Sequence, residues 1–87
     1  MYNLISRYMA KLTKDDVNNF AISKNVTLSS EELDFTYLFI QKNWEQIIKN
    51  PKLLNLDRYK DNFSPDNFFK IKKLFNEYSA KYQNLLN

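Results

Sequence analysis

The sequence predicts an all-α fold, a compact bundle of about five helices around a central helix at residues 30–49. Three helices are expected to be substantial and two short, within a single domain of residues 1–87. No segment alternates apolar and polar residues over the length of a strand. In two segments, apolar side chains instead recur at spacings of three and four, which places them on one helix face. These are Leu33, Tyr37, Ile40, Trp44 and Ile47 in the central segment, and Phe68, Ile71, Phe75, Tyr78, Tyr82 and Leu85 in the last.

Polar residues mark where helices begin and end. Thr13 with Asp16, and Ser29 with Glu32, have the spacing of a capping box, in which a hydroxyl and an acid each bind a backbone amide. Asn25 is expected to end the helix that follows Thr13 in the left-handed conformation, since the chain has no glycine for that position. The side chains that this helix is expected to bury are Val17, Phe20 and Ala21.

The two prolines predict two more helix starts. Pro51 ends the central helix at the preceding residue and suits the first turn of a new one, with Asn50 as its cap. Ser64 before Pro65 repeats this signal at the start of the last helix. The short helices are expected at residues 51–60 and near the N-terminus, where one apolar face is expected to pack on the rest of the domain. That face is formed by Leu4, Ile5, Tyr8, Met9 and Leu12.

Composition argues against catalysis. The chain contains no cysteine, so it has no thiolate nucleophile and no sulfur ligand for a metal. It also contains no histidine, which is the commonest general base and the commonest ligand of transition metals. Without glycine it has no phosphate-binding loop. We therefore expect no enzyme activity, no catalytic, cofactor or metal site, and no small-molecule substrate. No apolar run reaches the roughly 18 residues that span a bilayer, and we expect a cytoplasmic protein without membrane contact.

The formal charge of +3 is unevenly distributed. Residues 1–36 carry four basic and five acidic side chains, whereas residues 37–87 carry nine basic and five acidic ones. Lys70, Lys73 and Lys81 lie away from the apolar stripe of the last helix with Phe69 among them, and such a basic surface with an aromatic ring resembles a single-strand nucleic-acid binder. With Lys72, these lysines are the candidate contacts for nucleic acid. Residues 12–48 also have the outline of a helix-turn-helix, but acidic residues occupy the start of its second helix, where phosphates would lie.

Several quoted segments resemble a family of small uncharacterised all-helical proteins from low-GC Gram-positive bacteria. They are KLT at residues 11–13, VTLSSEE at 26–32, FIQKNW at 39–44 with the helix end at Asn50-Pro51, and Ser64-Pro65 before Leu74-Phe75. The resemblance spans residues 11–82 and implies a helical fold, with no activity to transfer. It draws attention to Asn43 beside Trp44, which is either a polar contact inside the bundle or a recognition spot.

The sequence therefore predicts a non-catalytic protein-protein interaction module, with a second copy of the chain as one candidate partner. The alternative is a nucleic-acid-binding accessory protein that uses the lysine-rich last helix or a degenerate helix-turn-helix. The candidate apolar contacts of a dimer are Phe69, Leu86 or the edge formed by Phe35 and Phe39. The candidate interaction residues are Asn43, Trp44, Phe39, Phe69, Lys70 and Lys73.

Overall fold

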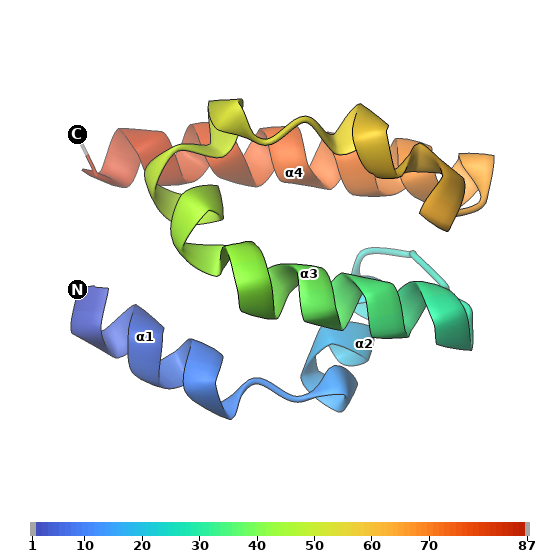
Figure 1. Cartoon of the computed structure of the whole chain (residues 1–87), viewed down its shortest axis with the longest axis horizontal. Coiled ribbons are helices and arrows are strands. Elements are labelled where there is room, and N and C mark those ends of the chain that lie inside the picture. The colour runs from blue at the N-terminus through green and yellow to red at the C-terminus, as the bar shows by residue number, and fades with distance from the viewer. Residues whose placement is uncertain (1, 87) are drawn as a thin grey trace. The chain divides into compact units, whose positions relative to one another are not determined.

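The computed structural model describes residues 2–86, and the side chains of residues 3–81. Every regular element in that range is helical, so the predicted all-α fold is confirmed. Four α-helices and two short 3₁₀ segments follow one another along the chain (Figure 1). They are α1 (Tyr2–Lys11), α2 (Lys14–Ser23), α3 (Ser30–Lys49), η1 (Pro51–Leu53), η2 (Leu56–Asn62) and α4 (Pro65–Leu86).

The chain divides into two compact units. The first runs through Lys42 and contains α1, α2 and the larger part of α3, and the second begins at Asn43 and contains the end of α3, η1, η2 and α4. The predicted central helix has the expected bounds and takes part in both units.

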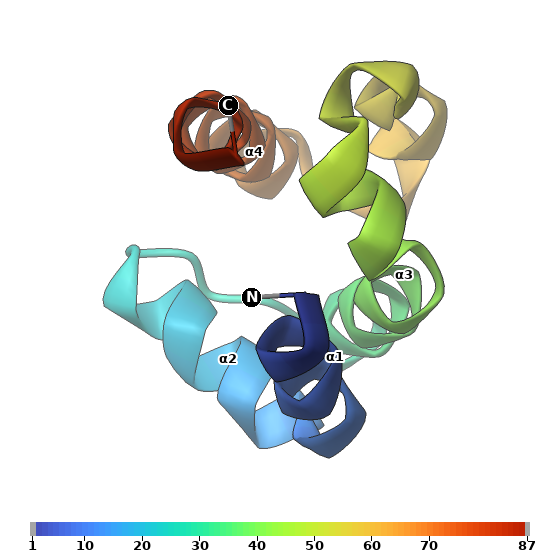
Figure 2. The same ribbon diagram turned by 90° about the vertical axis from the view of Figure 1, so that its left-hand side faces the viewer.

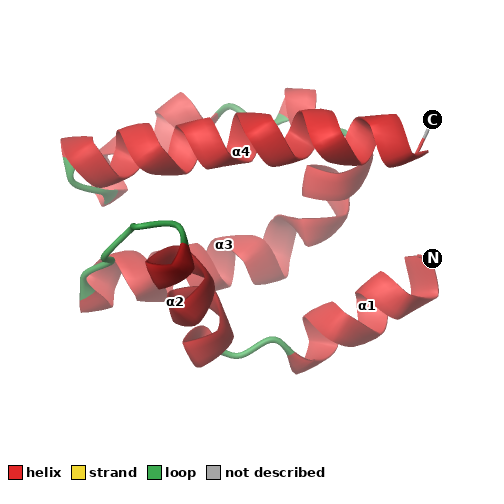
Figure 3. Cartoon of the chain, turned by 180° about the vertical axis from the view of Figure 1, so that it is seen from behind, coloured by secondary structure: helices red, strands yellow, loops and turns green. Residues whose placement is uncertain are grey.

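Polar contacts join α3 to both other helices of the first unit. Figures 2 and 3 show the ribbons of these three helices, α1, α2 and α3. The side-chain amide of Gln41 donates a hydrogen bond to the backbone carbonyl of Met9 at 3.1 Å, which ties α3 to α1. Lys14 Nζ lies 2.7 Å from Asp34 Oδ1 and connects the start of α2 with α3. Both partners of this ion pair are about half exposed, so it positions the helices more than it stabilises them.

The end of α2 forms the most buried part of the first unit. Asn25 has φ 64°, the predicted left-handed conformation. The amide of Val26 then donates to the Ala21 carbonyl and the amide of Asn25 to the Ile22 carbonyl, which is the Schellman pattern. This turn brings Val26 back onto the helix, where it is only 1% exposed beside the buried Ala21 and Val17. Phe20 was expected to be buried there too, but it is 48% exposed, and Lys24 Nζ lies 5.8 Å from its ring centre.

Both predicted capping boxes are present. Thr13 and Asp16 exchange backbone-to-side-chain hydrogen bonds of 3.1 Å at the start of α2. At the start of α3 the Ser29 amide donates to Glu32 Oε1 at 2.8 Å, and the Glu32 amide donates to Ser29 Oγ at 3.1 Å. Glu32 is 7% exposed, so its carboxylate is a buried acceptor with a fixed backbone donor.

The capping box of α3 gives a matched pair of serines for a stability test. Ser29→Ala removes the hydroxyl that accepts from the Glu32 amide, and we expect it to lower the free energy of unfolding by about 1 kcal/mol. Ser30→Ala changes an exposed first-turn residue and should leave stability within about 0.5 kcal/mol of wild type. Urea unfolding followed by circular dichroism measures both. Equal losses in the two variants would contradict a specific role for the Ser29 cap.

In the second unit the connector differs from the prediction. Residues 51–60 were expected to form one short helix, but the chain forms η1 and η2 with an extended break between them. Pro51 does begin η1, whereas the Asn50 side chain makes no capping hydrogen bond. At the start of α4, by contrast, Ser64 Oγ accepts from the Asn67 amide at 3.2 Å, as predicted.

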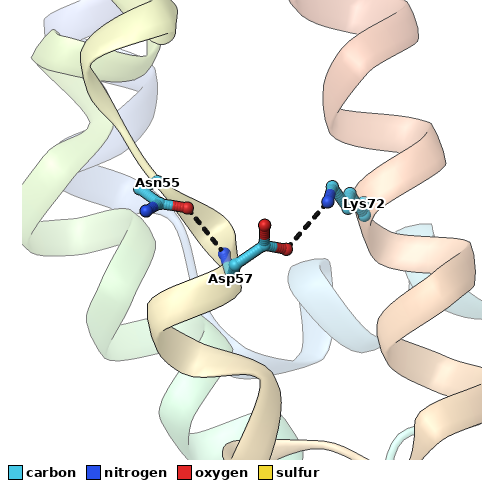
Figure 4. A network of polar contacts seen from close by, with 3 residues as sticks. All are labelled: Asn55, Asp57 and Lys72. Carbon is cyan, nitrogen blue, oxygen red and sulfur yellow. Dashed lines mark hydrogen bonds and ion pairs between the residues drawn. The ribbon is translucent and has the colours of Figure 1, made fainter.

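An ion pair between side chains connects η2 with α4 (Figure 4). The Asn55 side chain accepts from the Asp57 amide at 3.1 Å and fixes the start of η2. The Asp57 carboxylate then accepts from Lys72 Nζ of α4 at 2.7 Å.

The described members of the predicted stripe on α4 are half-buried, and Tyr82 and Leu85 lie outside the described side chains.

Candidate functional site

One departure from the predicted packing lies on α1. Leu4 is 68% exposed and Tyr8 is 62% exposed. They stand four residues apart, so they share one face of the helix, and the exposed Arg7 and Lys11 lie on that same face. We refer to Leu4, Arg7, Tyr8 and Lys11 as the outer face of α1.

Three other apolar side chains, two on α1 and one directly after it, are partly covered. Ile5, Met9 and Leu12 are half-buried, and the backbone of Met9 is held by Gln41 of α3. The expectation that all five apolar residues near the N-terminus form one packed face is therefore wrong for Leu4 and Tyr8. The helix has two apolar stripes about 100° apart, and the neighbouring helices cover only one of them.

The outer face carries positive charge without compensation. Helix α1 has no acidic residue in its first turn or elsewhere in its ten residues. Among the described side chains, Arg7 and Lys11 form no ion pair, whereas Lys14, Lys70 and Lys72 each do. The outer face thus combines two exposed apolar side chains with two available cations.

The structure distributes the predicted interaction residues over both units. Phe39 is half-buried in the first unit, and its ring stacks on that of Phe35 with centres 6.1 Å apart. Asn43 and Trp44 lie in the second unit on the last turns of α3, where both are half-buried. Their proposed role as recognition residues stays a prediction.

The lysine-rich surface of α4 is less basic than its sequence indicates. Phe69 is 70% exposed and Lys73 is exposed one turn further on, as expected for a surface patch. Lys70, however, pairs with Asp66 at 3.3 Å, and Lys72 pairs with Asp57 at 2.7 Å. Exposed ion pairs of this kind are weak, but each acid places a negative charge beside a lysine that would otherwise meet a phosphate.

Among the described residues, no group of three or more acidic side chains gathers in a geometry that could hold a metal ion. Within the same range, no helix combines the length and apolar character needed to cross a bilayer.

Sequence reasoning missed the outer face of α1, although its signal was present. Residues 4, 7, 8 and 11 have the spacing i, i+3, i+4, i+7 of a single helix face.

Comparisons with protein-family models, curated proteins and solved structures found no significant match to this chain. The resemblance to small helical proteins of low-GC Gram-positive bacteria therefore stays a prediction.

Proposed function

We propose that this protein is a non-catalytic protein-protein interaction module of the cytoplasm and that the outer face of α1 is its binding surface. The observation that carries this proposal is the exposure of Leu4 and Tyr8 on a helix whose other apolar stripe is packed. A leucine and a tyrosine one turn apart are typical anchors for a partner, because each buries a large apolar area on contact.

The charges on this face point to the chemistry of the partner. Arg7 and Lys11 flank the two apolar anchors and have no acidic neighbour on α1. A complementary surface would offer an apolar patch with carboxylates at its edge, for example an amphipathic helix with acidic flanks. Helix α1 itself carries no carboxylate that could pair with Arg7 and Lys11 of a second copy. A different protein therefore fits better than a symmetric contact between two α1 helices.

Nucleic-acid binding remains the alternative, and the ion pairs of Lys70 and Lys72 weigh against it. Glu31 and Asp34 also stand near the start of α3, where a recognition helix would approach phosphates. These charges favour the protein-binding proposal because a phosphate-binding surface gains its affinity from unpaired cations.

A capture experiment separates the two proposals. Tagged protein is incubated with extract of the cells in which it occurs, after complete nuclease digestion, and the captured proteins are identified by mass spectrometry. We expect one protein to be retained after digestion and to be lost only gradually between low and physiological salt, because apolar anchors contribute to the contact.

Loss of all bound protein on nuclease treatment would contradict the proposal and favour the nucleic-acid alternative. A labelled 20-residue oligonucleotide, single- or double-stranded, is expected to bind weakly, with an affinity that falls steeply with salt. Sedimentation equilibrium of the protein alone identifies the remaining case, a second copy of the chain as the partner, by a mass of twice 10.5 kDa.

A further inference from the structure

The second unit contains a half-open pocket of about 350 Å³, which lies between η1 and one face of α4. Its volume falls within the range of pockets that hold small organic ligands, roughly 300–1,000 Å³. The residues that line it are Pro51, Lys52, Leu54, Phe75, Asn76, Ser79 and Ala80.

The floor of the pocket is apolar. Pro51 is buried, and Leu54 and Phe75 are half-buried. Phe75 and Ser79 stand one turn apart on α4, so they face η1 together. Ser79 Oγ is enclosed and has no hydrogen-bond partner within the described part of the chain.

Two polar side chains at the pocket are free to bind a ligand. Lys52 and Asn76 are exposed, and their side chains form no hydrogen bond or ion pair with any of the described residues. The ammonium of Lys52 and the amide of Asn76 are both hydrogen-bond donors, and no acidic side chain lines the pocket. A cation with a neutral donor beside an apolar floor is complementary to a carboxylate attached to a hydrocarbon chain.

We infer that this pocket binds a medium-chain carboxylate, with the hydrocarbon chain on Pro51, Leu54 and Phe75 and the carboxylate on Lys52 and Asn76. The inference concerns binding alone, since Ser79 Oγ has no hydrogen-bonded base among the described residues that would activate it as a nucleophile. This inference is independent of the partner surface on α1, and the two can fail separately.

Octanoate and its neutral counterpart octanamide are suitable probes, titrated into the isotope-labelled full chain at neutral pH. Amide chemical shifts in two-dimensional NMR spectra report affinity and place of binding together. We expect saturable shifts at residues 52–54 and 75–80 with octanoate, and weaker binding with octanamide. Hexanoate should bind roughly 15-fold more weakly than octanoate, because each buried methylene contributes roughly fourfold in affinity.

Lys52→Met tests the charge while it keeps the apolar stem of the side chain. We expect this variant to bind octanoate about tenfold more weakly and to leave octanamide unchanged, because only the carboxylate gains from the ammonium. Lys60→Met is the matched control, since Lys60 is an exposed lysine of the same unit outside the pocket. Ala80→Leu fills the pocket from an exposed helical position and is expected to abolish binding of both probes.

Three results would overturn the inference. One is the absence of saturable shifts with octanoate, and another is a set of shifts confined to the first unit. The third is an equal loss of octanoate affinity in Lys52→Met and Lys60→Met, which would reduce the effect to net charge. Circular dichroism of each variant confirms that the fold is intact before binding is compared.

Discussion

Val26→Asp is expected to cost roughly 3–5 kcal/mol of folding free energy, as an uncompensated buried charge does. Val26 is 1% exposed, the lowest value among the core residues, and it packs where the chain turns back onto α2. The aspartate would have to stay charged without a partner, take up a proton at a cost in free energy, or unfold the turn that Asn25 forms. Because small domains have only about 5–15 kcal/mol of stability, this single change should bring the first unit close to unfolding.

Ile22→Asp is the matched control, because it places the same charge on an aliphatic residue of the same helix end that is 56% exposed. Its expected cost is under about 1 kcal/mol, mainly from an acid near the negative end of the α2 dipole. Urea unfolding followed by circular dichroism, with amide hydrogen exchange to assign losses to each unit, measures both variants. Similar losses for the two would show that the turn around Val26 is not the centre of the first unit.

Leu4→Glu combined with Tyr8→Glu is expected to weaken binding of the captured partner by about 100-fold or more, because two anchors of an interface are lost together. The same double variant should lose less than about 1 kcal/mol of stability, since both side chains are exposed in the free protein. Surface-based binding kinetics with the purified partner measure the first effect, and urea unfolding measures the second.

Asn19→Glu combined with Asn62→Glu adds the same charge at exposed polar positions that are not part of the outer face of α1. This control should change the affinity by no more than about threefold, through long-range repulsion from an acidic partner. If the control weakened binding as strongly as the α1 variant, net charge and not the outer face would determine the contact.

Local signals in the sequence predicted the helix ends because each depends on residues close together in the chain. Thr13, Ser29 and Ser64 cap the helices they were expected to cap, and Asn25 takes the left-handed conformation that the absent glycines would otherwise supply. The prediction of a single helix at residues 51–60 was wrong. Asn50 provides no side-chain cap, and residues 51–53 form only one 3₁₀ turn after helix α3 ends.

Burial was predicted less well, because periodicity identifies an apolar face without saying which neighbour covers it. Leu4 and Ile5 are adjacent apolar residues, and α3 covers the side of α1 on which Ile5 lies. Phe20 has the right spacing to join Val17 and Ala21, but its ring is 48% exposed, with Lys24 Nζ 5.8 Å from the ring centre. The pocket beside Pro51 depends on the path of η1, which no local pattern specified.

Site-specific photocrosslinking tests the central claim most directly. A photoreactive phenylalanine derivative replaces Tyr8 on the outer face of α1, Asn19 as an exposed control on α2, or Phe69 as the exposed aromatic of α4. After irradiation in the cells in which the protein occurs, we expect one discrete protein adduct from position 8 and none from position 19, and the position 8 adduct should disappear when Leu4→Glu is added. Discrete adducts from position 69 alone, or adducts to nucleic acid from any position, would contradict the assignment of the outer face as a protein-binding surface.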